Sequence, residues 1–529
     1  MKKAIALGIV FLFAAGVGTA NLLVAPQETT HTITPIGSSS IEAVPVDEAA
    51  HTLEASPTVV ENAWRPMAYP LDTEVIATQD NELHPTMATS GSTYFVGYTL
   101  APTMMERNIA MALSMDGGQT YESAGYFDIQ GVEDYPDIAH WGGNTFYGTF
   151  SGLTQGGYQY LLEVLDITNT ETWSLVYWDW SSYGWSNIHA LDIASHNSQE
   201  QWEYGAITGV ASTDYEDYDI TNGPHMFFAS PDEEGTGYIS WLSMDGANTS
   251  AVTMDKQEDM IWGTWDIYND TNDVWNTLYW ARSFTNPLEG SSSAAVIPTE
   301  FDMKNPSIAA KDGQVVILAQ SNENGNEDII CLRSSGGGNW QTSYVTTSGD
   351  NDRYPTVSSS GDSFVCTFVR NGNLYYASSE DNGATWSAPS QMNGQDGTVL
   401  SEYATADATS VGAIWSDTRN GNSDIYFGQF PVPVVGVDTV SGGFGVSATI
   451  ANTGTADAEN VDWSITLSGT VFLGGEASGT IDSLPAGSST DIDTGLVLGI
   501  GSVDIAVTAS DAEKTTSGFV LGPFVLGVE

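Results

Sequence analysis

Cysteine and basic residues are scarce in this 529-residue chain. Its two cysteines, Cys331 and Cys366, are too few for a disulfide scaffold, which leaves one disulfide between them or, by default, two buried thiols. Lysine and arginine together number 13 against 67 acidic residues, so the formal net charge is −54. A charge of this sign repels nucleic acid and anionic lipid and argues against either as a partner.

Long apolar runs are also scarce, and the one present lies at the N-terminus. Lys2 and Lys3 precede an apolar run over residues 4–17 and a small-residue segment over residues 18–20. This order predicts that residues 1–20 are a signal peptide or an uncleaved N-terminal anchor. Residues 21–70, rich in Thr, Ser, Pro and Glu without a period, are predicted to form a linker. We therefore expect a secreted or cell-surface protein whose membrane contact is limited to such an anchor.

Sustained helical periodicity is absent after residue 20, and a β-strand repeat takes its place. Four short strands open with an X-Pro dipeptide: HPTMATSG from His84, YPDIAHWG from Tyr135, NPSIAAKDG from Asn305 and YPTVSSSG from Tyr354. Aromatic-rich strands and Gly/Asn turns follow them, which is typical of β-hairpins. Weaker copies bring the count to seven, so an all-β protein with a seven-bladed β-propeller over residues 71–432 is predicted, with six blades as the alternative. The last copy lacks its fourth strand, and residues 73–78 are expected to supply it and close the ring.

Two segments, SMDGGQTY over residues 114–121 and SEDNGATW over residues 379–386, share the frame Ser-x-Asp-x-Gly-x-Thr-aromatic. The frame predicts a tight turn in which the Asp accepts amide hydrogen bonds and the Gly takes a positive φ. It resembles the Asp-box of sialidase-like (BNR-repeat) β-propellers. The two aspartates are 265 positions apart, five steps of about 53 residues, close to the ~50 residues of a propeller blade. The predicted structural Asp-box residues are Ser114, Asp116, Gly118 and Thr120 in the first copy, and Ser379, Asp381, Gly383, Thr385 and Trp386 in the second.

Residues 434–529 differ in composition and are dominated by Gly, Ser, Thr, Val and Ala. FGVSATI places Phe444, Val446, Ala448 and Ile450 on one strand face, and VDWSITL repeats the alternation. A small β-sandwich is predicted here. The segment over residues 452–461 resembles a turn of CARDB-like immunoglobulin-type modules.

A propeller brings the approach to each innermost strand and each turn between second and third strands to one face, termed here the mouth face. Four of the seven arginines map to it, and with them the tyrosines that begin several repeats. Guanidinium groups match carboxylates, so the arginines form either a carboxylate-binding patch or separate pairs with neighbouring acids. The candidate ligand-binding residues are Arg107, Arg353, Arg370, Arg419, Tyr135, Tyr354, Tyr403 and Asp417.

The sialidase resemblance implies a Tyr nucleophile, a Glu partner, an Asp acid/base and three arginines around the substrate carboxylate. Tyr135, Tyr354 and Tyr403 are interpreted as equivalent repeat positions, so none stands out as a nucleophile. No catalytic set is predicted, and whether the chain is an enzyme stays open.

Clustered aspartates offer hard oxygen ligands for Ca²⁺ in two predicted loops. They are Asp214, Asp217 and Asp219 in the first loop and Asp270 and Asp273 in the second. Solvated acidic loops are the alternative, and no other cofactor is predicted.

Three functions remain in view. The first is an exported propeller that binds a glycan or a cell-surface protein. The alternatives are an exo-acting glycoside hydrolase of sialidase type and a structural subunit of a surface layer. Convergence of the four arginines on one pocket would favour the hydrolase.

Overall fold

The computed structural model describes residues 72–103, 105–127, 132–152, 158–179, 184–195, 205–213, 220–229, 237–241, 244–255, 258–283, 293–337, 339–431, 433, 435–452, 454, 457–510 and 512–528. The predicted signal or anchor (1–20) and linker (21–70) lie outside them. The chain divides into two compact units, Met1–Gln429 and Phe430–Glu529. Within the described ranges, none of the helical structure has the length and apolarity to span a membrane.

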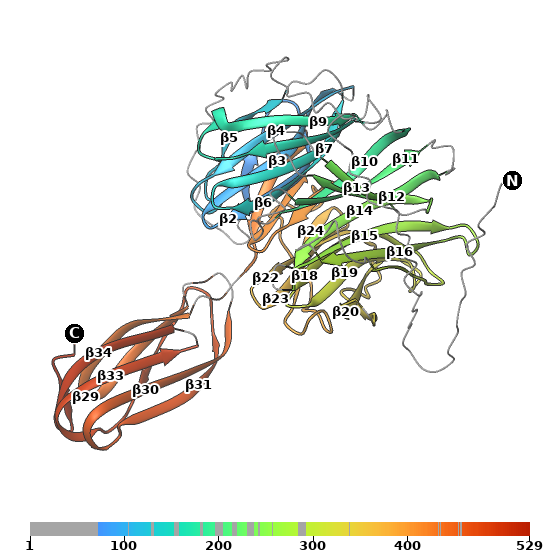
Figure 1. The fold of residues 1–529 in the computed structure, drawn as a ribbon. Coiled ribbons are helices and arrows are strands. Elements are labelled where there is room, and N and C mark those ends of the chain that lie inside the picture. Colours follow the sequence, from blue (N-terminus) through green and yellow to red (C-terminus); the bar gives the residue numbers. More distant parts are fainter. Residues whose placement is uncertain are drawn as a thin grey trace. The chain divides into compact units, whose positions relative to one another are not determined.

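The first unit is a seven-bladed β-propeller, as the repeat count predicts (Figure 1). Its described residues form seven four-stranded antiparallel sheets, and in the first six the first strand of the blade lies innermost. Blade one consists of β2 (Asn81–Ser90), β3 (Thr93–Thr103), β4 (Glu106–Ser114) and β5 (Glu122–Phe127). Blade two consists of β6 (Glu133–Gly142), β7 (Thr145–Gly152), β8 (Tyr158–Val164) and β9 (Trp173–Asp179), with the 3-10 turn η3 (Thr170–Thr172) before β9. Blade three consists of β10 (Trp185–Ala194), β11 (Gly205–Thr213), β12 (Ile220–Ala229) and β13 (Gly237–Trp241). Blade four consists of β14 (Ala247–Asp255), β15 (Met260–Asn269), β16 (Val274–Ser283) and β17 (Ser293–Ile297). Blade five consists of β18 (Met303–Lys311), β19 (Gln314–Ser321), β20 (Asp328–Ser335) and β21 (Gln341–Tyr344). Blade six consists of β22 (Asp352–Ser360), β23 (Ser363–Arg370), β24 (Asn373–Ser379) and β25 (Ser390–Gln391).

Blade seven joins the two ends of the propeller sequence. It consists of β26 (Ala406–Ala408), β27 (Gly412–Asp417), β28 (Asp424–Gln429) and, outermost, β1 (Asp72–Ile76). β1 pairs antiparallel with β28, with Thr73 opposite Phe427. The N-terminal strand therefore closes the ring, as expected for residues 73–78, and supplies the fourth strand of blade seven.

The innermost strands of four blades bend at the residue before a proline. His84, Tyr135, Asn305 and Tyr354 have φ of 49°, 55°, 50° and 54°, and the register with the second strand shifts beside each. Such a β-bulge bends the strand and redirects a side chain. In these four strands, the X-Pro pair in the sequence therefore identifies the position of the bulge at the mouth face, where the side chain before the proline is redirected.

The core of the propeller lies between neighbouring blades. Phe95 of blade one, for example, meets Phe146 of blade two edge to face, with ring centroids 5.5 Å apart. Cys331 and Cys366 lie in the cluster between blades five and six, where both are buried and free, and no disulfide joins them. Burial raises the pKa of the Cys331 thiol to about 12.

Both Asp-box turns have the predicted hydrogen bonds. The Asp381 carboxylate accepts the Thr385 N–H (2.8 Å) and the Thr385 hydroxyl (2.7 Å), while the Gly383 N–H donates to Ser379 Oγ (2.8 Å). The first copy repeats these contacts around Asp116. The turns follow the third strands of blades six and one, away from the mouth face, and act as fold elements.

The second unit is a single curved sheet around its own core (Figure 1). In its described residues, the order is β31-β30-β33-β34-β35-β29-β32. The strands are β29 (Val435–Asn452), β30 (Ala458–Leu473), β31 (Glu476–Leu484), β32 (Ser489–Asp493), β33 (Leu498–Ala509), β34 (Ala512–Gly522) and β35 (Phe524–Leu526). Val446, Ala448 and Ile450 are buried as predicted, but Phe444 is not, with 66% of its surface exposed. Gly445 between Phe444 and Val446 has φ of 90°, which breaks the alternation of the strand.

Candidate functional site

A cavity of about 350 Å³ occupies the centre of the propeller. Residues of all seven innermost strands line it, so it is the axial channel of the ring. Three carboxyl groups reach its wall, those of Asp137, Asp192 and Asp407. The channel is therefore acidic.

The three channel aspartates also connect neighbouring blades. Each accepts a backbone N–H from the following innermost strand: Asp137 from Ile193 (2.7 Å), Asp192 from Val252 (3.2 Å) and Asp407 from Met87 (3.0 Å). Burial and the nearby Asp137 carboxylate raise the pKa of Asp192 well above its usual range and that of Asp407 to about 7. Protons are thus retained in the channel at near-neutral pH.

Asp134 organises the mouth of the channel. Its buried carboxylate pairs with Arg107 and accepts the Thr99 hydroxyl (2.7 Å) and the Tyr135 N–H (2.9 Å). His84 Nδ1 lies 2.6 Å from Asp134 Oδ1. Hydrogen bonds from four groups fix the carboxylate, and it in turn fixes the orientation of the His84 ring.

Aromatic rings and one accessible carboxylate surround His84. Its imidazole stacks on Tyr135, with centroids 4.2 Å apart at 21°, and the ring of Tyr403 lies 5.8 Å from that of Tyr135. Glu402 Oε1 is 3.7 Å from His84 Nε2, and 46% of the Glu402 side chain is exposed. We call His84, Arg107, Asp134, Tyr135, Glu402 and Tyr403 the mouth cluster.

The protonation of His84 decides what the mouth cluster offers a ligand. Burial lowers the pKa of His84 to about 4, with Glu402 opposing the shift and Arg107 adding to it. A neutral imidazole that donates its Nδ1 proton to Asp134 keeps a lone pair on Nε2. His84 Nε2 and the Glu402 carboxylate are then two neighbouring acceptors, and they are complementary to hydroxyl or ammonium donors.

The tyrosines of the mouth cluster are phenols at neutral pH. Burial raises the pKa of both Tyr135 and Tyr403, and the carboxylates of Asp192 and Asp266 raise that of Tyr403 further. Formation of a tyrosinate nucleophile is correspondingly unfavourable.

Each of the four mouth-face arginines pairs with its own acid. The pairs are Arg107 with Asp134, Arg353 with Glu327, Arg370 with Asp352 in a two-bond fork (2.6 and 2.8 Å), and Arg419 with Asp417 and Asp72 (2.6 Å each). All four guanidinium charges are therefore already balanced, so the separate pairs describe the structure better than a carboxylate-binding patch.

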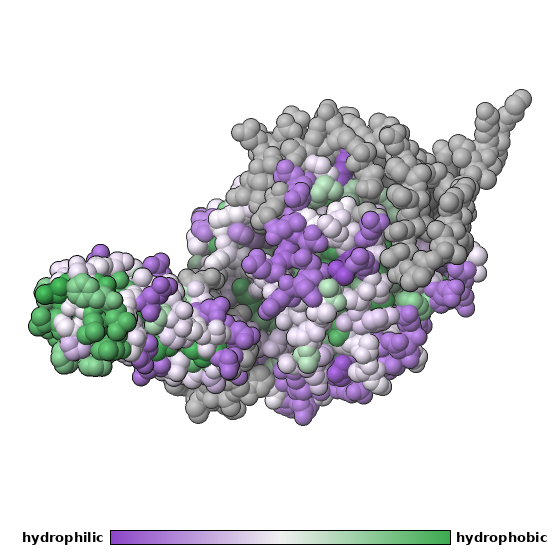
Figure 2. Space-filling view, turned by 90° about the horizontal axis from the view of Figure 1, so that it is seen from below, coloured by the Kyte–Doolittle hydropathy of each residue, from purple (hydrophilic) through white to green (hydrophobic). Residues whose placement is uncertain are grey.

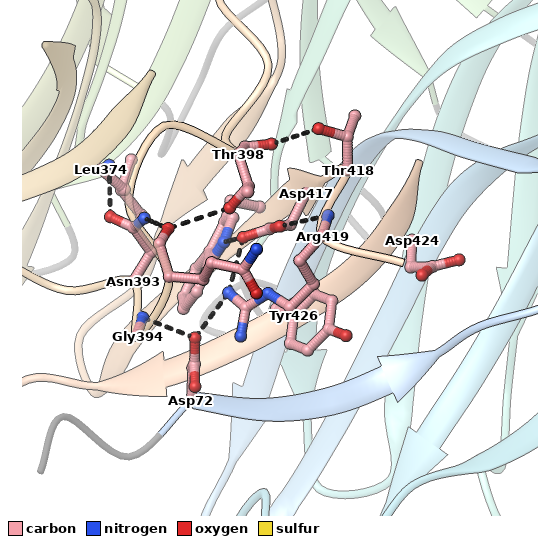
Figure 3. Close-up of polar contacts among 12 residues, drawn as sticks. Asp72, Leu374, Asn393, Gly394, Thr398, Asp417, Thr418, Arg419, Asp424 and Tyr426 are labelled. Atoms are coloured by element: carbon pink, nitrogen blue, oxygen red, sulfur yellow. Dashed lines mark hydrogen bonds and ion pairs between the residues drawn. The ribbon is translucent and has the colours of Figure 1, made fainter. Parts of the chain in front are cut away.

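Arg419 is the clearest structural arginine (Figure 3). Its guanidinium lies 3.9 Å from the centroid of the Tyr426 ring and bridges Asp417 of β27 to Asp72 of β1. Asp72 also accepts the Gly394 N–H (2.8 Å) from the loop after blade six. Arg419 and Asp417 thus hold the seam of the ring.

The interpretation of three equivalent tyrosines is wrong for Tyr403. Tyr135 and Tyr354 occupy the left-handed position of their bulges, but in blade seven that position is taken by Ala404, with φ of 57°. Blade seven lacks the X-Pro pair that fixes this register in blades two and six. Only Tyr135 and Tyr403 belong to the mouth cluster.

The structure describes only one of the two loops predicted to bind calcium. Asp214, Asp217 and Asp219 lie outside the described residues. Asp270 and Asp273 are exposed in the turn between β15 and β16, where Asp273 accepts the Tyr268 hydroxyl (2.5 Å). No group of three His, Cys, Asp or Glu side chains among the described residues could hold a metal ion.

The channel aspartates were missed by the sequence interpretation. Asp137 and Asp192 share the tripeptide Asp-Ile-Ala inside otherwise apolar strands, a signal that could have indicated them. Asp407 carries no such signal, because only ring closure brings it next to blade one.

No family model matches this chain, and no curated protein matches it. The Asp-box family assignment and the CARDB-like resemblance therefore remain predictions. Solved structures with a similar fold include a protein of unknown function from Dyadobacter fermentans (10% identity, TM-score 0.40, covering 67% of this chain and 96% of that one). A mutant Trypanosoma rangeli sialidase with trans-sialidase activity (10%, 0.37, 84% and 85%) and a Fusarium graminearum α-L-arabinofuranosidase (9%, 0.37, 68% and 97%) are also similar. Similarity at this level carries no information on function.

Proposed function

We propose that this protein is an exported propeller that binds a neutral carbohydrate chain at the mouth of its channel. The observation that carries the proposal is the mouth cluster itself. It combines aromatic rings with two hydrogen-bond acceptors, while the arginines around it are already paired.

Sugar chemistry fits these groups. Sugar hydroxyls donate to the Glu402 carboxylate oxygens and to the Nε2 lone pair of the neutral His84 ring. The apolar C–H face of a pyranose or furanose packs on an aromatic ring such as Tyr135. A few placed polar groups beside aromatic surface are the usual composition of a small-ligand site.

Charge selects against an acidic sugar. Glu402 is partly exposed, and among the described residues no lysine or arginine forms an ion pair with it. A sialic acid carboxylate would be repelled here, whereas a neutral hexose or pentose chain would not. The proposal therefore departs from the substrate class that the sialidase resemblance implies.

The test is a glycan array followed by calorimetric titration of the neutral oligosaccharides that bind. Tyr135→Ala and Glu402→Gln are each expected to weaken binding by roughly tenfold or more, since each removes one of the few groups that orient the sugar. Tyr344→Ala, on the exposed outermost strand β21, is the matched control and leaves affinity unchanged. Binding confined to sialylated glycans, or no glycan binding, would contradict the proposal.

Hydrolysis is the second candidate, and the raised pKa of Asp407 favours it. A carboxyl group that holds its proton near neutral pH is what a general acid requires. If the protein is a hydrolase, it should release nitrophenol from neutral nitrophenyl glycosides, and Asp407→Asn should abolish release while glycan binding persists. Release that survives this substitution would remove Asp407 from that role.

A further inference from the structure

The second unit exposes an unusual amount of apolar surface. Of the fifteen large hydrophobic side chains that are exposed in the described residues, ten belong to this 100-residue unit. Phe472, at 74% exposure, and Phe444, at 66%, are the most exposed among them. Figure 2 shows hydrophobic residues gathered at one end of the unit. A patch of this kind marks an interaction site in a soluble protein.

Strand register makes the patch continuous. Ile500, Leu521, Phe524 and Phe444 pair in sequence across β33, β34, β35 and β29. All four are at least half exposed, while Val520, next to Leu521, is fully buried. The row therefore lies on the outer face of the sheet, opposite the core. We call Phe444, Phe472, Ile500, Phe519, Leu521 and Phe524 the apolar end.

Polarity changes along the strands in a fixed order. On the outer face of β34, Leu521 and Phe519 are followed by Ser517 and Thr515 and then by Glu513. β33 repeats the order, because its outward residues Leu498 and Ile500 give way to a serine at 502 and an aspartate at 504. Outward residues on a strand are ~7 Å apart, so the apolar zone is roughly 10 Å deep.

The apolar end is also free of charge in a strongly acidic chain. Residues 439–452, 463–475, 494–503 and 515–528, which supply its strands and the turn between β34 and β35, contain no Asp, Glu, Lys or Arg. The nearest charge along β33 is Asp504, and the nearest on the outer face of β34 is Glu513; Lys514, exposed beside Glu513, is the one basic residue in these two strands.

We propose that the apolar end inserts into the interface of a lipid bilayer whose headgroups are zwitterionic and carry no net charge. Interfacial elements bury an apolar face ~5–10 Å deep and keep their polar groups in the headgroup layer, and the order from apolar through hydroxyl to acidic residues matches such a planar boundary. A second copy is the less suitable occupant. It would bring the same acidic zone against Asp504 and Glu513, and like charges across an interface are unfavourable. Anionic lipid is disfavoured for the same reason.

The experiment places an environment-sensitive fluorophore on the full chain through Phe472→Cys. Cys331 and Cys366 are fully buried, so labelling is confined to the introduced thiol. Phosphatidylcholine vesicles are expected to shift the emission to the blue, and replacing half of the lipid by phosphatidylglycerol should weaken the shift. The label reports the apolar end itself, which separates this contact from any binding through the predicted N-terminal anchor. The same label at Glu513→Cys is the control and should not respond.

A second variant tests the residues that insert. Ile500→Ser combined with Leu521→Ser, in the labelled chain, should lower the lipid affinity of the label at Phe472→Cys by roughly tenfold or more. Both residues are exposed on the outer face, so the fold is retained. No response to vesicles, or a response that needs no lipid and rises with protein concentration, would overturn the proposal; the latter would identify a second copy as the occupant.

Discussion

The imidazole of His84 lies between a balanced carboxylate and an unbalanced one. Asp134 is neutralised by Arg107, whereas Glu402 is partly exposed to solvent and forms no ion pair with a lysine or arginine of the described residues. Because the buried ion pair is already complete, desolvation dominates the ring and keeps it neutral. A single neutral histidine thereby turns the mouth of the channel into an acceptor site.

This predicts a measurable dependence of stability on pH. The pKa of His84 is about 4 in the folded state, below the 6.5 of an unperturbed histidine, so its stabilising contribution is complete above pH 6.5 and is lost as pH falls toward 4. The shift corresponds to about 3 kcal/mol. Urea unfolding of wild type and His84→Gln between pH 4 and 8 should show their difference shrinking by this order toward acid pH. An NMR titration of the ring near pH 6.5 would contradict the assignment.

At the scale of elements, the Asp-box turn is a contact between blades as well as a turn. Gly383 has φ of 78°, and a Cβ at this position would lie 2.9 Å from Val316 Cγ1 and 3.0 Å from Cys331 Sγ of blade five. Gly118 has the same relation to Phe427 of blade seven. Gly337 approaches Trp262 in the same way in a turn without the Asp-box sequence, so the packing is more widespread than the motif.

Gly383→Ala should therefore destabilise the propeller by about 2–4 kcal/mol, from left-handed strain and overpacking together. Gly361→Ala is the matched control, because Gly361 has φ of 52° and no atom within 4 Å of its would-be Cβ. The control should cost about 1–2 kcal/mol, for strain alone. Equal losses by urea unfolding would show that the close approach between blades contributes nothing.

Local patterns were enough to predict strands, turns and blade number. X-Pro pairs and Asp-boxes act within a few residues, which is why His84, Tyr135 and Gly383 could be placed from the sequence. The partners of Arg107 and Arg353 could not, because Asp134 and Glu327 lie on neighbouring blades and are brought close by the ring. The residues that line the channel could not be predicted for the same reason, because the channel forms only when the seven innermost strands surround one axis.

At the scale of the whole molecule, the propeller stays closed through the pairing of β1 with β28, which we call the seam. Arg419 bridges Asp72 and Asp417, and Asn422 donates a hydrogen bond to the Thr78 carbonyl (3.2 Å). Glu82, buried beside Asp424 at the same seam, has its pKa raised to about 8 by burial. Seam closure thus depends on ionic and polar groups as well as on strand pairing.

Arg419→Ala is expected to destabilise the propeller by about 3–5 kcal/mol, because it leaves the buried Asp417 carboxylate without its cation. Arg353→Ala breaks a more exposed pair with Glu327 and should cost about 1 kcal/mol or less. Thermal and urea unfolding at neutral pH compare the two. A loss for Arg419→Ala no larger than that for Arg353→Ala would show that the seam does not depend on this bridge.

The seam also determines when the ring can close during synthesis, because it joins the first and the last strand of the propeller sequence. β1 is translated about 350 residues before its partner β28. At ~5–20 residues per second, the ribosome delivers that partner roughly 20–70 s later. Until then the earlier blades can only stack as an open arc, and a five-residue strand waits without a neighbour. The last gap in the propeller is therefore filled by the first of its strands to be made.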